Sequence, residues 1–212
     1  MNKHSFFEKW SDLHGGVEVR GAVKIWLIIS YALVKPLALI KTSPHILTLL
    51  GVISGVGVWL QAKTLWAFPL LVLSLLCDGI DGSLAIVREI TSDWGAVTDS
   101  VADRITEFFW ALTFILLGAP IFVIAFAWLA AGVQEYIRAR TSGLGEKKIL
   151  VVSIAERPVR ASLLFIALLV YHWQQDLVYL LGWAWLIMQL LSCVLILRSG
   201  YRRLSGTDRS SN

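Results

Sequence analysis

Six long runs of apolar residues restrict what this chain can fold into. They fall at residues 45–62, 67–87, 95–118, 120–141, 158–172 and 176–198. A helix needs about 20 apolar residues to cross the hydrocarbon core of a bilayer, which is roughly 30 Å thick. Of the 212 residues, 57% are hydrophobic and 16% are charged, whereas about a quarter of a soluble domain is charged. We therefore expect an all-α membrane protein with six transmembrane helices, forming a single domain over residues 1–212.

A seventh apolar segment, residues 21–41, precedes these runs. Lys35 and Pro36 interrupt it, and its uninterrupted apolar core of about ten residues is too short to span a membrane. We expect an N-terminal amphipathic helix that lies in the membrane interface. Residues 1–16 are polar and lack the apolar stretch of a secretory signal, so a cleavable signal peptide is not expected.

The distribution of basic residues predicts the orientation. With six spans and a cytoplasmic N-terminus, only Lys63 of the 19 Lys and Arg residues would lie outside. Counting the seventh segment as a span would also place Lys3, Lys9 and Arg20 outside, which fits the positive-inside rule less well. We expect a multi-pass protein of the cell membrane with both termini facing the cytoplasm.

Four aspartates lie at the cytoplasmic ends of the second and third spans in this topology. Asp78 and Asp81 are three residues apart and Asp99 and Asp103 are four apart, so each pair shares one face of a helix. Carboxylates inside a membrane segment are costly unless they are paired, hydrated or bound to a cation. Two such pairs on helices joined by a short turn offer oxygen ligands for a Mg²⁺-like ion. The same acids would also suit a buried polar network or the ion relay of a small cation transporter.

The aspartates belong to a longer pattern that resembles the signature of the CDP-alcohol phosphatidyltransferase family. That signature reads D-x-x-D-G-x-x-A-R, then eight residues, then G-x-x-x-D-x-x-x-D. The matching positions are Asp78, Asp81, Gly82, Ala85, Gly95, Asp99 and Asp103. Ile86 stands where the family has an arginine near the nucleotide phosphates. Arg88 is two residues further on, about 200° around a helix, and would not replace it within a continuing helix.

The resemblance implies transfer of a phosphatidyl group from CDP-diacylglycerol to a small polar alcohol, with release of CMP. Asp103 would take the proton of the acceptor hydroxyl as the catalytic base. The implied ligands of one or two Mg²⁺ or Mn²⁺ ions are Asp78, Asp81, Asp99 and Asp103. The implied CDP-lipid contacts are Asp78, Gly82, Ala85 and Gly95. Membrane lipids are expected partners, nucleic acid is not, and the resemblance is compatible with a homodimer.

A basic cluster near the fifth span bears on the acceptor alcohol. The run Glu156-Arg157-Pro158-Val159-Arg160 resembles the E-R-P-x-x-R run of the actinobacterial phosphatidylinositol-phosphate synthases. Because arginine binds phosphate bidentately, the cluster favours a phosphorylated acceptor, with inositol phosphate preferred to glycerol 3-phosphate. The expected acceptor-phosphate residues are Arg138, Arg157, Arg160 and Arg198. The alternatives are that these charges serve only membrane topology or that the chain is a non-catalytic scaffold.

Overall fold

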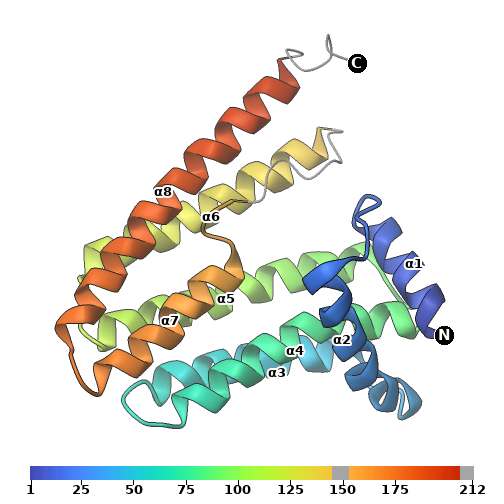
Figure 1. Ribbon diagram of the computed structural model, residues 1–212, viewed down its shortest axis with the longest axis horizontal. Helices are drawn as coiled ribbons and strands as arrows, with labels where there is room; N and C mark the ends of the chain where they lie inside the picture. The colour runs from blue at the N-terminus through green and yellow to red at the C-terminus, as the bar shows by residue number, and fades with distance from the viewer. Residues whose placement is uncertain (145–152, 206–212) are drawn as a thin grey trace. The chain divides into compact units, whose positions relative to one another are not determined.

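The computed structural model of this protein describes residues 1–144 and 153–205. The elements in these two ranges are all α-helices, which confirms the expected all-α class (Figure 1). The eight helices are α1 (Lys3–Leu13), α2 (Gly21–Leu39), α3 (Pro44–Leu60), α4 (Ala67–Val87), α5 (Asp93–Leu116), α6 (Ile121–Gly143), α7 (Arg157–Tyr171) and α8 (Asp176–Leu204).

Helices α3 to α8 overlap the six apolar runs that were expected to span a membrane. By length and composition, α2, α4, α6 and α8 are each able to cross a bilayer, and α3 is a shorter apolar helix. Large apolar side chains on these helices are exposed, for example Phe122 on α6 and Leu180 on α8. These are features of an integral membrane protein; the number of spans stays a prediction.

Helix α2 differs from the short apolar core expected from its sequence. It runs unbroken for 19 residues through Lys35 and Pro36, which makes it long enough to cross a membrane. A proline inside a helix removes one backbone donor, and α2 ends at Leu39, shortly after Pro36. Its buried side chains Leu27, Ser30 and Val34 lie three to four residues apart, as expected for one packed face of a helix.

The chain divides into two compact units. The first comprises Met1–Gly57 and Pro69–Thr106, and the second comprises Val58–Phe68 and Glu107–Asn212. In the second unit, α6 packs extensively along α8, and α7 also contacts α8.

Helix α1 was not anticipated, because residues 1–16 are mostly polar. The Asn2 side chain caps it by accepting a hydrogen bond from the Ser5 N–H at 2.9 Å. Its apolar residues follow helical spacing, and Phe6 is fully buried in a cluster with Leu27 of α2 and Ile86 of α4. Burial of a Phe side chain contributes roughly 1.5–3 kcal/mol, so this contact attaches α1 to the rest of the first unit.

A short linker, residues 88–92, joins α4 to α5 and is fixed at both ends. Glu89 has a positive φ of 58°, and the Ile90 N–H bonds to the Ala85 carbonyl at 3.0 Å, as in the glycine-type ending of a helix. Ser92 then caps α5, because its hydroxyl accepts a hydrogen bond from the Gly95 N–H at 3.0 Å. The linker thereby sets the position of the α5 aspartates relative to those of α4.

Candidate functional site

Three of the four aspartates come together in the first unit. Asp78 of α4 and Asp99 and Asp103 of α5 are half-buried, and each offers a carboxylate oxygen within 4.8 Å of the other two. Octahedral Mg²⁺ holds its oxygen ligands at about 2.1 Å, which places them roughly 3–4 Å from one another. Small side-chain rotations would bring these three oxygens to that spacing, so the donor set fits a hard divalent cation.

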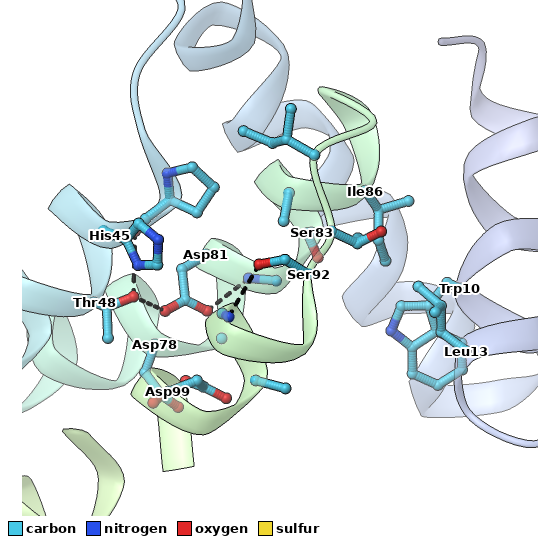
Figure 2. Close-up of a pocket in the computed structure, with 18 of the residues that line it drawn as sticks. Trp10, Leu13, His45, Thr48, Asp78, Asp81, Ser83, Ile86, Ser92 and Asp99 are labelled. Carbon is cyan, nitrogen blue, oxygen red and sulfur yellow. Dashed lines mark hydrogen bonds between the residues drawn. The ribbon is translucent and has the colours of Figure 1, made fainter. Parts of the chain in front are cut away.

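The fourth aspartate, Asp81, has a different environment. It is buried, its Oδ2 accepts a hydrogen bond from the Thr48 hydroxyl at 2.5 Å, and its Oδ1 accepts one from the Gly82 N–H at 2.6 Å (Figure 2). These bonds orient the carboxylate at the wall of the site. Its role as a metal ligand stays a prediction.

A cavity of about 640 Å³ adjoins the acidic cluster. Asp78, Asp81 and Asp99 line it, and so do the three small residues of the signature, Gly82, Ala85 and Gly95. A Cβ added to Gly82 would meet no atom within 4 Å, so this part of α4 faces open space. All four residues predicted to contact the CDP-lipid therefore line one cavity, while Asp103 belongs to the acidic cluster beside it.

Sequence reasoning missed other residues that line this cavity. His45 and Thr48 of α3 contribute from one side, and Trp10 and Leu13 of α1 contribute from another (Figure 2). The only signal for α1 was the spacing of Phe6, Phe7, Trp10 and Leu13, which repeats at three to four residues as on one helix face. Nothing in the sequence marked Thr48 as the partner of an aspartate 33 residues away.

Ile86, at the position of the family arginine, is an apolar packing residue here. It is 4% exposed, packs with Phe6 and Leu27, and also lines the cavity. Because α4 ends at Val87, helix geometry no longer excludes Arg88 from that role, but its guanidinium donates to the Thr42 carbonyl at 2.7 Å instead. Arg88 therefore fastens the α2–α3 connection.

The four arginines predicted to bind the acceptor phosphate belong to the second unit. Arg160 is 2% exposed and donates to Glu107 Oε1 at 2.7 Å and to the Ala155 carbonyl at 3.1 Å. Arg157 lies with its guanidinium 5.4 Å from the Trp110 ring centroid. The surroundings of Arg160 are those of a structural ion pair, and its predicted role in acceptor binding has no direct support in this geometry.

Arg138 and Arg198 differ in exposure. Arg198 is exposed on α8, whereas Arg138 is half-buried and donates through both terminal nitrogens to the two oxygens of Glu156. Burial would raise the pKa of Glu156, but the hydrogen bonds from Arg138 and from the Ser153 N–H outweigh it and hold that pKa below its ordinary value. A substrate phosphate would have to compete with Glu156 for Arg138.

A buried row of amides continues from Arg160 between α7, α8 and α6. Gln189 Oε1 accepts from Arg160 at 3.4 Å, and Gln189 Nε2 donates to Gln134 Oε1 at 2.7 Å. Gln134 Nε2 donates in turn to the Ser153 hydroxyl at 3.1 Å. Buried polar groups of this kind are stabilising when each finds a partner, and this row connects three helices of the second unit.

The structure has known neighbours in fold. The crystal structure of phosphatidylinositol phosphate synthase (PgsA1) from Mycobacterium tuberculosis with CDP-DAG bound matches with a TM-score of 0.67 and 22% sequence identity, covering 82% of this chain and 94% of that chain. The structure of the same protein with manganese and citrate also has a TM-score of 0.67 and 22% identity, covering 81% of this chain and 88% of that one. At this level of identity the likeness establishes the fold.

Two curated relatives match about half of the chain. An archaetidylinositol phosphate synthase from Aeropyrum pernix is 32% identical over 114 residues, and an uncharacterized protein from Aquifex aeolicus is 33% identical over 118 residues. The matched regions cover 51% and 50% of this chain. Each match spans 58% of the relative's length.

A family model described as CDP-alcohol phosphatidyltransferase matches residues 41–195, which include the whole aspartate signature and the helices from α3 to most of α8. The family resemblance read from the sequence is thereby confirmed. This chain belongs to the CDP-alcohol phosphatidyltransferase family.

Proposed function

We propose that this protein transfers a phosphatidyl group from CDP-diacylglycerol to the hydroxyl of a small phosphorylated alcohol and releases CMP. The observation that supports this most strongly is the cluster of Asp78, Asp99 and Asp103 beside a cavity that Gly82 and Ala85 help to line. An ion relay in a transporter would need the acids but not the small residues that open a cavity beside them.

The aspartates have separate roles in this proposal. Asp78, Asp99 and Asp103 would hold a Mg²⁺ or Mn²⁺ ion, and Asp81, whose carboxylate is bonded to Thr48, lines the adjoining cavity. A bound divalent cation would offset the negative charge of the donor pyrophosphate and of the departing CMP. Asp103 accepts the proton of the acceptor hydroxyl. The hydroxyl oxygen then forms a bond to the lipid-side phosphorus, and the bond from that phosphorus to the CMP oxygen breaks.

We propose inositol phosphate as the acceptor. The name of the Aeropyrum pernix relative, an archaetidylinositol phosphate synthase, supports this choice, as does the E-R-P-x-x-R run at Glu156 to Arg160. Arg198, which is exposed on α8, is the better candidate for direct phosphate contact. Arg160 and Arg157 both lie within 4.0 Å of Glu107, and Arg138 is paired with Glu156.

We further propose that α3 to α8 are six membrane spans and that α2 lies in the interface, with the site and both termini in the cytoplasm. The exposed apolar residues of α2, among them Ile25, Ile29 and Leu33, would contact lipid. The proposal predicts that a cysteine at Ser92 reacts with a membrane-impermeant maleimide only after the cytoplasmic face is opened. A cysteine at Lys63 should react from outside. The reverse pattern would contradict the proposed orientation and place the site on the external face.

The test of the activity is CMP release by the purified chain in detergent with labelled CDP-diacylglycerol, Mg²⁺ or Mn²⁺, and a panel of alcohols. The panel contains inositol phosphate, glycerol 3-phosphate, free inositol, glycerol and serine, with each product identified by its mass. Asp99→Asn should abolish release, whereas Asp176→Asn, an exposed acid in the first turn of α8, should not. Carboxylate-dependent ion flux in liposomes without CMP release would contradict the enzymatic proposal and indicate a transporter. A preference for glycerol 3-phosphate would contradict only the proposed acceptor.

A further inference from the structure

The cavity in the first unit has two chemically different ends. One end carries Asp78 and Asp99 of the acidic cluster. The other is formed by Trp10 and Leu13 of α1 and by His14, which directly follows the helix. Trp10 and Leu13 lie well apart from the aspartates, with Ile86 on the same side as α1 (Figure 2). A ligand that fills this cavity would therefore meet carboxylates at one end and aromatic surface at the other.

The aromatic end has an ordered geometry. The Trp10 indole and the His14 ring are stacked, with centroids 4.0 Å apart and planes inclined by 17°. His14 Nδ1 also lies 2.7 Å from the Trp10 carbonyl oxygen, so both rings are held at the C-terminal end of α1. Stacked rings offer a flat apolar surface against which a planar heterocycle can stack.

Helix α1 is fastened to the site by three kinds of contact. Phe6 is fully buried against Leu27 and Ile86. The Tyr31 hydroxyl donates to the Met1 carbonyl at 2.9 Å. Lys9 Nζ donates to Glu89 Oε1 at 3.1 Å, which ties α1 to the linker between the two aspartate-bearing helices. An apolar side chain at Ile86 makes the first of these contacts, where an arginine would place a charge beneath Phe6.

From these observations we infer that α1 is part of the donor site, and that Trp10, backed by His14, contacts the nucleoside base of the CDP-lipid. The inference rests on the proposed function, which places the pyrophosphate at the acidic end. The base is joined to that pyrophosphate through the ribose. It is uncharged and planar, and it would reach the aromatic end of the same cavity. Ile86 stands at the position of the family arginine. Its apolar contact with Phe6 thus keeps α1, and with it Trp10, beside the cavity.

The test compares two probes, CDP and inorganic pyrophosphate, by titration calorimetry on the full chain in detergent with Mn²⁺. Loss of a stacked aromatic weakens binding of a base by roughly 5- to 100-fold. We expect Trp10→Ala to raise the Kd for CDP by about tenfold and to leave the Kd for pyrophosphate unchanged. Trp10→Phe should restore most of the CDP affinity, because the aromatic face returns. Trp66→Ala, an exposed tryptophan in the α3–α4 connection, is the matched control and should bind both probes normally.

A second variant tests the attachment of α1. Phe6→Ala removes the buried anchor and should weaken CDP binding in the same direction as Trp10→Ala, again without affecting pyrophosphate. The inference is overturned if Trp10→Ala binds CDP as tightly as the unaltered chain, or if it weakens pyrophosphate to the same degree. If the unaltered chain binds neither probe with Mn²⁺ present, the proposed function itself fails, and the inference with it.

Discussion

Replacing Arg160 by methionine should destabilise the protein through the loss of a buried ion pair. Arg160 Nη2 lies 2.7 Å from Glu107 Oε1, and the two side chains are 1% and 0% exposed. Removing one partner of such a pair costs about 3–5 kcal/mol, because the other charge is left buried. Arg157 Nε lies 4.0 Å from the same Glu107 oxygen and would compensate in part, which favours the lower end, about 3 kcal/mol. For a protein of this size, that loss corresponds to a fall in Tm of roughly 6–12 °C.

The assay is thermal unfolding in detergent, followed by the loss of monodisperse protein. Arg198→Met makes the same chemical change at an exposed position on α8 and should alter the Tm by no more than about 2 °C. Combining Arg160→Met with Glu107→Leu should cost less than the sum of the two single changes, since neither member of this buried pair is left without the other. An Arg160→Met protein with an unchanged Tm and a raised acceptor KM would refute this reasoning and make Arg160 a phosphate ligand.

Three further outcomes follow from single contacts in the structure. Gly79→Ala places a Cβ 2.6 Å from Trp26 Cζ2 and should lower stability by about 1–3 kcal/mol; an unchanged Tm would mean that the Trp26 ring moves aside without cost. Lys41 has a φ of 58°, so Lys41→Gly should raise stability by about 1 kcal/mol, and a lower Tm would show that the lysine side chain matters more than its backbone. Because the pKa of Glu156 is held below its ordinary value, its pairing stabilises the fold at neutral pH and this contribution is lost as the pH falls through that lowered pKa. Glu156→Gln should therefore lower the Tm at pH 7 and make the fall of Tm in acid less steep. An equally steep fall would show that Glu156 does not account for the acid sensitivity.

The clustering of the aspartates could be predicted largely because its determinants are local. The apolar runs and the signature both lie within short stretches of sequence, and α4 and α5 are joined by only five residues. The pairs at positions 78 and 81 and at 99 and 103 therefore had to be close to one another. The structure brings three of these acids within ligand distance, and the fourth takes its orientation from Thr48.

The contacts that sequence reasoning missed depend on residues far apart in the chain. Arg160 pairs with Glu107, 53 residues away, and no local pattern distinguishes such an arginine from one that binds a ligand. Helix α1 is short and polar on one face, so its docking depended on a cluster with Leu27 and Ile86 that forms only in the folded chain. The position of Pro36 likewise did not reveal the length of α2, because the helix continues through this proline and ends at Leu39.

The most direct test of the account follows the oxygen atoms of the transfer. The acceptor alcohol carries a heavy isotope of oxygen in its reacting hydroxyl, and the purified chain is supplied with CDP-diacylglycerol and Mg²⁺. The account predicts two products, unlabelled CMP and a lipid phosphodiester that retains the heavy oxygen, because the hydroxyl attacks the lipid-side phosphorus. Phosphatidic acid together with a labelled CMP-alcohol would show attack on the other phosphorus and contradict the proposed transfer. No metal-dependent product with any alcohol would contradict the enzymatic function as a whole.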